Sequence, residues 1–354
     1  MNVLVTGSGG LIGSEAVRYF DTDGNQVIGI DNNMRKLFFG PEGDVAWKLK
    51  KLQEQTNNFT NYNIDIRNKE EIDKLFTQHG FDLVIHCAAQ PAHTKAEEIP
   101  ILDFEVNALG TLHLLEATRC YCPDAVFIHM STNKVYGNAP NEIPVVEMES
   151  RYEFSDSRFY EGLDERCRID QCTHTLFGAS KTAGDIMAQE YAHSFGLKVG
   201  IIRGGCLTGP SHSGVELQGF LSYLVKVAIL RKTFTIHGYS GKQLRDQIHS
   251  YDVVRAFAEY AANPRPGEVY NIGGGRSNSA SVLESITLVE VITGKKINYT
   301  CVDKPRKGDQ ICNIANTKKF RNHYPNWSVT IGLEEIVTEM VESEMSRLSK
   351  HYMC

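Results

Sequence analysis

The spacing of three glycines near the N-terminus constrains the fold of this chain more than any other feature. An apolar run, Val3–Thr6, leads into a turn in which Gly7, Gly10 and Gly13 stand three residues apart. Glycines at this spacing allow a tight turn, let the backbone approach a pyrophosphate, and let the next helix pack closely on the strand. The start of that helix offers free N–H groups and a positive dipole end to phosphates. The pattern predicts a strand, a phosphate-binding turn and a helix, although a plain glycine-rich connection is the alternative.

The next apolar run ends in an acid. Val27–Ile30 is followed by Asp31 and Asn32. A carboxylate at the end of a second strand can bind both hydroxyls of an adenosine ribose and repels a 2′-phosphate, so NAD is favoured over NADP. The alternative is that Asp31 is a helix cap or a turn residue. We therefore expect Asp31 and Asn32 to lie at the adenosine end of a dinucleotide site.

Strand-like apolar runs alternate with helical patterns as far as Ile201–Arg203. This alternation predicts an α/β fold with a doubly wound parallel Rossmann sheet. We expect residues 1–203 to form an NAD-binding Rossmann domain, to which a strand and a helix return from about 237–272. Residues 204–354, where the periodicity is less regular, should form mainly a smaller substrate-binding lobe. The polar segment 140–170 is longer than an ordinary loop, and such loops are usually functional or mobile.

Composition excludes several classes of function. A net charge of −6 gives no reason to expect nucleic acid as a partner, and no apolar run approaches the length of a bilayer span. The N-terminus reads directly into a strand rather than into a leader. The nine cysteines are scattered, and the closest pair, Cys120 and Cys122, lacks the spacing of a metal site. We expect a soluble, cytoplasmic protein that binds no metal.

Two segments resemble the extended short-chain dehydrogenases/reductases. Leu176–Lys181 is similar to the Tyr-x-x-x-Lys helix of that family, but Phe177 stands where the family has the tyrosine that takes the substrate's proton. Lys181 is retained. Ser131–Gly137, Ser-Thr-Asn-Lys-Val-Tyr-Gly, resembles the element that follows the fifth strand in members acting on nucleotide sugars. The resemblance implies that Thr132 carries the catalytic hydroxyl and that Lys181 binds the nicotinamide ribose.

The same resemblance implies further cofactor contacts. Residues 62–67 look like a third strand with the acid-hydrophobic pair that holds adenine, and residues 83–89 look like a fourth strand whose small residues lie against the cofactor. Residues 107–111 resemble the family's Asn-x-x-Gly-Thr element. Helical stretches at 99–119 and 178–195 would build a homodimer or homotetramer interface, although their apolar faces could equally be core. The implied NAD-binding residues are Gly7, Gly10, Leu11, Ile12, Gly13, Asp31, Asn32, Asp65, Ile66, Ala88, Ala89, Asn107 and Lys181.

The residues after Thr132 point to one branch of the family. Nucleotide-sugar 4,6-dehydratases have an Asp-Glu pair where this chain has Asn133 and Lys134, so the acid needed for dehydration is missing. Asn-Lys at these positions, and the segment Gly241–Asp246, resemble the CDP-tyvelose (CDP-paratose) 2-epimerases. In that branch the arginine matching Arg245 binds the substrate diphosphate. The implied substrate-binding residues are His93, Asn133, Arg203, Cys206, Arg245 and Arg306.

The branch implies an NAD-dependent epimerase that oxidises a nucleoside-diphosphate sugar to a ketone and returns the hydride to its other face, at C2 of a CDP-deoxysugar. Another redox outcome, such as 4-epimerisation, is the first alternative. A catalytically inactive nucleotide-binding protein is the second, because Phe177 cannot carry a proton. For the missing base we favour His174, which on a helix would share a face with Phe177 and titrates near neutrality. A capping or solvent-facing role is its alternative, as packing is for Cys206 and an ordinary loop position for His93.

Overall fold

The centre of the molecule is one parallel sheet of seven strands. The computed structural model describes residues 1–216 and 218–352. The strand order of this sheet is β12-β8-β5-β4-β1-β2-β3, and every neighbouring pair of strands is parallel. This confirms the doubly wound Rossmann sheet. The strands are β1 (Asn2–Thr6), β2 (Gln26–Ile30), β3 (Phe59–Tyr62), β4 (Leu83–His86), β5 (Val126–Thr132), β8 (Lys198–Gly204) and β12 (Val269–Ile272).

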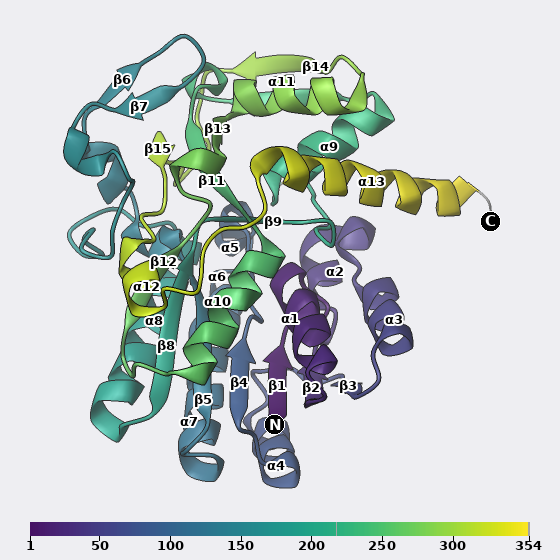
Figure 1. Cartoon of the computed structure of the whole chain (residues 1–354), viewed down its shortest axis with the longest axis vertical. Coiled ribbons are helices and arrows are strands. Elements are labelled where there is room, and N and C mark those ends of the chain that lie inside the picture. Colours follow the sequence, from purple (N-terminus) through teal and green to yellow (C-terminus); the bar gives the residue numbers. More distant parts are fainter. Residues whose placement is uncertain (217, 353–354) are drawn as a thin grey trace.

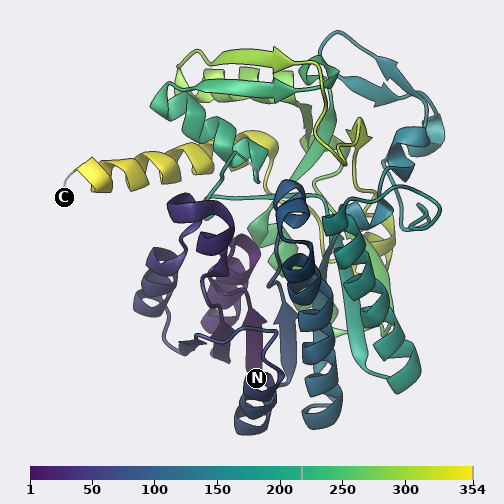
Figure 2. The same cartoon turned by 180° about the vertical axis from the view of Figure 1, so that it is seen from behind.

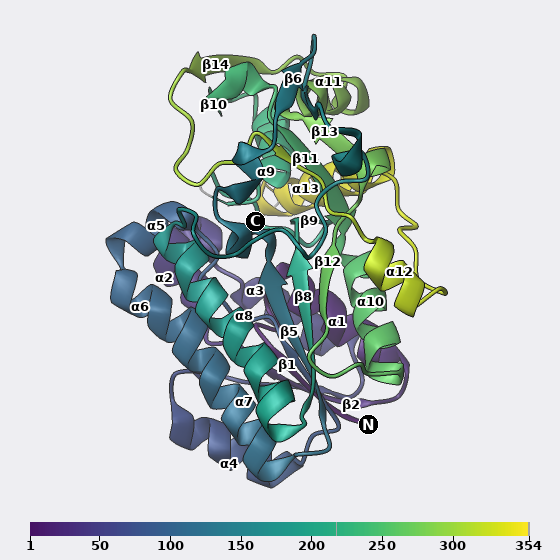
Figure 3. The same ribbon diagram turned by 90° about the vertical axis from the view of Figure 1, so that its left-hand side faces the viewer.

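The central strands are predominantly apolar because helices cover both faces of the sheet. The helices α1 (Leu11–Thr22) and α10 (Ser250–Ala262) lie on one face. The helices α4 (Lys69–His79), α7 (Gly110–Tyr121) and α8 (Leu176–Phe195) lie on the other (Figure 3). Both layers are continuous apolar clusters, so the sheet is a rigid platform for its carboxyl edge.

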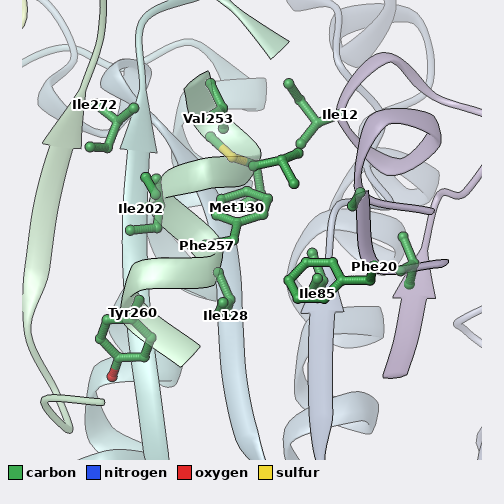
Figure 4. Packing of buried hydrophobic residues seen from close by; sticks show 14 of the residues in the cluster. Ile12, Phe20, Ile85, Ile128, Met130, Ile202, Val253, Phe257, Tyr260 and Ile272 are labelled. Atoms are coloured by element: carbon green, nitrogen blue, oxygen red, sulfur yellow. The ribbon is translucent and has the colours of Figure 1, made fainter. Parts of the chain in front are cut away.

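Figure 4 shows how the first layer packs. Phe257 and Val253 of α10 lie over Met130 and Ile128 of β5 and Ile202 of β8. All five side chains are buried. Phe257 is among the largest fully buried side chains of the described chain. This packing holds α10 firmly on the sheet.

Two sequence expectations about local structure need adjustment. The stretch 62–67 was expected to be a strand, but β3 ends at Tyr62, and Asp65 lies beyond it. The Asp65 carboxylate accepts the backbone N–H of Arg67 at 2.9 Å, which turns the chain locally instead of extending it. The helical stretch 99–119 is a run of α6 (Pro100–Phe104), a π-helical turn over Glu105–Leu109, and α7.

A second group of elements lies above the carboxyl edge of the sheet in Figures 1 and 2. Helices α9 (Phe220–Leu230), α11 (Val282–Thr293) and α13 (Leu333–Tyr352) share an apolar cluster separate from the two layers of the sheet. Beside them, β10 (Thr233–His237) pairs with β14 (Asn298–Val302). A small sheet joins β11 (Leu244–His249) to β9 (Cys206–Thr208), β13 (Ser279–Ser281) and β15 (Cys312–Asn313).

The remaining elements are short. The acidic segment 140–170 contains a hairpin, β6 (Val145–Glu147) and β7 (Tyr152–Phe154), which Arg151 ties to Glu284 of α11 at 2.6 Å. No helix of the described residues is both long and apolar enough to cross a membrane. The other helices are α2 (Met34–Phe39), α3 (Ala46–Gln55), α5 (His93–Glu98) and α12 (Lys318–His323).

Candidate active site

A cavity of about 450 Å³ lies where the carboxyl ends of the parallel strands face α9 and β11. Ligands bind at this edge in open α/β sheets. Its wall collects most of the residues that the sequence singled out, from segments far apart in the chain. These are Gly7, Gly10, Leu11, Ile12, Gly13, Asp31, Asn32, Asp65, Ile66, Ala88, Ala89, His93, Thr132, Asn133, Phe177, Lys181, Cys206 and Arg245. Four others, Asn107, His174, Arg203 and Arg306, do not line it.

The glycine turn between β1 and α1 is built for close approach. Gly7 has φ of 68°, and a Cβ on it would lie 2.9 Å from the backbone of Ala88. A Cβ on Gly13 would overlap the carbonyl oxygen of Gly7. No side chain caps α1 at Gly10, so the first turn of the helix presents its backbone to the cavity. An anion at this turn would meet N–H donors and a positive dipole end.

Asp31 lies at the end of β2 with its carboxylate held by backbone donors. Its oxygens accept N–H groups from Gly9 at 2.9 Å and Asn33 at 2.8 Å. Burial raises the pKa of Asp31, against the effect of these bonds. Each oxygen keeps acceptor capacity for a ribose hydroxyl.

Two cations next to Asp31 were not predicted from the sequence. Burial lowers the pKa of Lys48, on α3, to about 7 and that of Arg35, on α2, to about 10. Lys48 donates to the carbonyl of Ser211 at 2.7 Å, and Arg35 donates to the carbonyl of Ser213 at 2.7 Å. Both line the cavity, so two cationic groups lie at the same end of the cavity as Asp31.

The other end of the cavity surrounds Phe177. The ring of Phe177 meets His93 edge to face, with centroids 4.8 Å apart. Lys181, one turn along α8, donates to the carbonyl of Met130 at 3.0 Å, and burial lowers its pKa to about 8. Thr132 completes this wall. Among the described residues that line the cavity there is no tyrosine, so no phenol replaces the missing one.

The expectation that His174 shares a helical face with Phe177 is wrong. Thr175 caps α8 by accepting the N–H of Gly178, so the helix begins only at Leu176 and His174 precedes it. The His174 Nε2 lies 2.7 Å from the carbonyl oxygen of Val135, to which it must donate its proton. The ring is thus bound to backbone behind the cavity wall. His174 therefore no longer serves as our candidate base.

Arg203 was expected to bind substrate, but the structure buries it in an ion pair. Its Nε and Nη2 donate to the two carboxylate oxygens of Asp185 at 3.0 and 2.7 Å, and Nη1 donates to the Tyr136 hydroxyl at 3.2 Å. Ser131 donates to the same carboxylate at 2.5 Å. Three of the five N–H groups of the guanidinium are used in these bonds, and the side chain does not line the cavity. Arg203 connects β8 to α8 and β5 instead.

Asn107 and Arg306 also lie away from the cavity. Asn107 is buried, and its amide joins the backbone of Gln90 to Ser180 of α8, with Nδ2 3.1 Å from the serine oxygen. It therefore holds α8 in place rather than facing a cofactor. Arg306 is exposed on the segment before Asp309.

Arg245 does line the cavity, but it is not free. Its guanidinium forms an ion pair with Asp309 and donates to the carbonyl of Leu244 at 2.6 Å. A diphosphate reaching this arginine would compete with the Asp309 carboxylate. Two residues further along β11, Gln247 is fully buried and lines the cavity, and neither atom of its amide has a hydrogen-bond partner. A buried polar group without a partner is costly, so a bound molecule would relieve it.

Several of these residues could not be found by motif. Lys48, Arg35 and Gln247 belong to no glycine or catalytic pattern, and tertiary packing alone brings them to the wall. Lys134 also lines the cavity, although the sequence marked it only as the residue that replaces an acid. Within the described part of the chain, no group of three or more His, Cys, Asp or Glu side chains is placed to hold a metal ion.

Comparison with known proteins assigns the family. The sequence profile of the NAD dependent epimerase/dehydratase family matches residues 3–273. The chain belongs to this family. It is 34% identical to the CDP-paratose 2-epimerase of Salmonella typhi over 349 residues, covering 97% of this chain and 98% of that protein. This epimerase/dehydratase assignment agrees with the resemblance seen in the sequence.

Solved structures of this family share the fold. The UDP-glucose 4-epimerase of Thermotoga maritima, solved with UDP-glucose, is 26% identical with a TM-score of 0.77, covering 98% of this chain and 100% of that one. The UDP-glucose 4-epimerase of Thermus thermophilus, in complex with NAD, is 26% identical with a TM-score of 0.76, covering 98% and 99%.

NAD is the cofactor of this epimerase/dehydratase. The cavity of this chain fits it on three observations. A Cβ at Gly7 or Gly13 would collide with neighbouring backbone, so glycines are needed to form this turn. Asp31 keeps acceptor capacity at the end of β2, and the Gln247 amide lacks a partner. The groups that would hold NAD are thus the β1–α1 turn, Asp31 and Lys181.

The first prediction concerns cofactor selection. Asp31→Ala should narrow the preference for NAD over NADP, because it removes the charge that repels a 2′-phosphate. Arg35 and Lys48, which remain beside this position, would then attract the 2′-phosphate. Calorimetric titration of apo protein with both dinucleotides measures this, and Asp23→Ala on the exposed turn after α1 is the control. Equal NAD and NADP affinities in the unaltered chain would contradict the role of Asp31.

The second prediction concerns the buried pair. Arg203→Met leaves the Asp185 carboxylate buried without its cation, which should cost about 3–5 kcal/mol of unfolding free energy. Urea unfolding measures it. Arg119→Met, which breaks the exposed pair with Glu116, is the control and should change stability little. Similar stabilities of the two variants would show that Arg203 is not a structural anchor.

Proposed function

We propose that this protein is an NAD-dependent epimerase of a nucleoside-diphosphate sugar, acting at C2 of a CDP-deoxysugar. The observation that carries the proposal is the pair Asn133 and Lys134 beside Thr132 in the cavity wall, where dehydratases of the family have two acids. Among the described lining residues the only carboxylates are Asp31 and Asp65, which follow β2 and β3 at the adenosine end. A general acid for expelling water is therefore missing where the sugar would lie. The 34% identity to a CDP-paratose 2-epimerase supports the same branch.

The side chains of the cavity wall would bind the sugar and orient it for the reaction. Bound NAD would supply a reversible hydride acceptor for the sugar carbon, so the reaction would involve no net oxidation. Thr132 places a hydroxyl where it can bind the sugar oxygen, and Lys181 provides a cation that stabilises negative charge on that oxygen. Phe177 and His93 form an apolar edge that excludes water from the same spot. Asn133, fixed by its bond to Asn313 at 2.9 Å, offers a further polar contact.

Arg245 is our proposed anchor for the diphosphate. Its guanidinium already holds one anion, Asp309, in the same place. A bidentate bond to phosphate is stronger and more specific than a bond to a neutral group. We propose that the substrate exchanges with Asp309 and that residues 204–354, apart from the return to the sheet, supply most of the sugar-nucleotide contacts. Residues 1–203 supply the NAD site.

We also propose that the protein is a cytoplasmic homodimer or homotetramer. The two helical stretches beside the sheet carry exposed apolar side chains, which a second copy would cover. All eight cysteines that the structure describes are free, which agrees with a reducing compartment. Sedimentation of the purified chain tests the assembly, and a monomer at micromolar concentration would contradict it. The exposed apolar residues are Ile101, Phe104, Leu109, Tyr121, Leu176, Ile186 and Phe195.

Three other functions remain as alternatives on the same scaffold. The UDP-glucose 4-epimerase structures favour a 4-epimerase, which would exchange UDP-sugars and not CDP-sugars. A net dehydrogenase would accumulate NADH steadily, whereas an epimerase leaves the bound cofactor unchanged. The absence of a phenol at Phe177 favours an inactive nucleotide-binding protein, but the retained Thr132, Lys181 and Arg245 in the cavity oppose it.

The substrate class can be tested through Arg245. Arg245→Ala should weaken the binding of CDP-linked sugars, because the diphosphate loses its charge-assisted partner, while NAD affinity stays unchanged. Titration calorimetry with CDP-, UDP- and dTDP-glucose on the NAD-loaded protein measures this. Arg321→Ala, an exposed arginine of α12, is the control. An unchanged affinity for every sugar nucleotide would show that Arg245 does not hold the diphosphate.

A further inference from the structure

Lys134 lies next to the position that lacks its phenol. It belongs to a 3₁₀ turn, Asn133–Tyr136, that follows β5 directly. The Thr132 hydroxyl accepts the backbone N–H of Lys134 at 3.2 Å, so the two residues are fixed to each other. The Lys134 carbonyl lies against the first turn of α8, where a Cβ on Gly178 would be 3.0 Å away. The lysine is thus anchored beside the helix that carries Phe177, and its side chain lines the cavity.

The surroundings of Lys134 make its neutral form more accessible than that of an ordinary lysine. The side chain is partly exposed to the cavity, and its Nζ donates to the carbonyl of Gly308 at 3.2 Å. Burial, followed by the positive charge of Arg245, lowers the pKa of Lys134 to about 8, against the opposing charge of Asp309. A neutral amine keeps its N–H bond to Gly308 and still has a lone pair. Such a lysine can accept a proton near neutral pH.

The other ionisable groups around Phe177 are less suited to this task. Burial, with Lys134 second, lowers the pKa of His93 to about 3, so its protonated form is disfavoured. Burial raises the pKa of the Cys206 thiol to about 11, so it stays protonated. Lys181 is directed to the Met130 carbonyl, and His174 faces backbone outside the cavity. A general base works best when its pKa lies near the working pH.

We propose that Lys134 is the catalytic base that takes the place of the missing tyrosine. The proposal rests on the epimerase function above. The hydroxyl O–H bond of the sugar breaks and its proton joins the lone pair of Nζ, while the hydrogen of the carbon–hydrogen bond would leave with both bonding electrons, as a hydride, to the oxidised cofactor and a carbonyl would form. On the return the ammonium of Lys134 gives the proton back to the same oxygen. Charge and protons balance over the cycle.

This assignment fixes the sign of the pH dependence. The amine must be neutral before it can accept a proton, so kcat/KM should rise with pH and level off above about 8. The charged groups that face Lys134 are Arg245 of β11 and Asp309 of the loop before β15, and the titratable neutral groups beside it are Cys206 of β9 and His93 of α5. A diphosphate on Arg245 would add negative charge and raise the pKa of Lys134 in the bound state.

One test reads the ionisation of Lys134 without turnover. Competitive acetylation of the folded protein with acetic anhydride between pH 6 and 10, read by peptide mass spectrometry, reports the fraction of each lysine that is neutral. Lys134 should become reactive with a midpoint near 8, against about 10.4 for an ordinary exposed lysine. A midpoint near the ordinary value would overturn the inference, even if the protein epimerises a sugar.

A second test measures turnover of CDP-paratose by variants of Lys134, with and without Phe177→Tyr. Lys134→Met should lower kcat by roughly 10²-fold or more and remove the alkaline rise of kcat/KM. Lys134→Arg should be equally slow, because a guanidinium keeps the charge but does not give up its proton. Adding Phe177→Tyr to Lys134→Met should restore much of the rate, since the phenol would reoccupy the position that the family uses. Lys304→Met, an exposed lysine of the segment before Asp309, is the matched control.

The outcomes separate the two proposals. Full activity of Lys134→Met, with an unchanged pH profile, would contradict the role of Lys134 and leave the epimerase function intact. A midpoint near 8 in the acetylation test together with no turnover of CDP- or UDP-sugars would contradict the proposed function, and with it any catalytic role for this amine. Circular dichroism of each variant excludes loss of fold as the reason for a slow rate.

Discussion

The buried pair between Asp185 and Arg203 is the constraint on which the geometry of the site depends. The Asp185 carboxylate is fully buried on α8 and accepts Arg203 of β8 and Ser131 of β5. The same guanidinium reaches the Tyr136 hydroxyl, which donates to Asn271 of β12 at 2.7 Å. One ionic centre thus joins three strands, one helix and the turn that carries Lys134. Because removing one partner of a buried pair is far costlier than breaking an exposed pair, we expect this centre to fix the elements relative to one another.

The rigid frame lets the cavity concentrate charge without collapsing. Five cationic side chains line its wall, against two carboxylates, in a chain whose net charge is −6. A cleft with one sign of charge attracts a ligand of the opposite sign. Both a dinucleotide and a sugar nucleotide carry a pyrophosphate, so two anionic groups would be accommodated, one at the β1–α1 turn and one at Arg245. Burial is the main reason that several of these cations hold their protons weakly, and neighbouring positive charges lower the pKa further at Lys48 and Lys134. The five cations are Arg35, Lys48, Lys134, Lys181 and Arg245.

The parts of the fold that follow from local physics could be predicted from the sequence. The central strands are mostly apolar because both faces of the sheet are covered. The turn after β1 requires glycines because a Cβ at Gly7 would collide with the backbone of Ala88, and a Cβ at Gly13 would collide with the carbonyl of Gly7. The placement of Thr132, Lys181 and Arg245 on the cavity wall followed from motifs at strand and helix ends. These features depend on neighbours in sequence or on a strand end, so a pattern can reveal them.

The features that could not be predicted from the sequence depend on single side-chain contacts between residues in different elements. Arg203 matched a family position, but Asp185 on another element turns it inward. His174 has the right spacing only if the helix includes it, and the cap at Thr175 excludes it. The value of Lys134 as a base depends on Arg245, more than a hundred residues away, and on burial that no motif encodes.

The most direct test of the proposed hydride transfer follows CDP-paratose by proton NMR while the purified protein converts it in D₂O. Epimerisation by transfer to bound NAD and back keeps the carbon-bound hydrogen within the active site, while Lys134 exchanges only the hydroxyl proton. The account predicts conversion to the C2 epimer with protium retained at C2 and no net NADH. Deuterium at C2 would mean that the carbon is deprotonated to solvent, and would contradict hydride transfer and the base assigned to it.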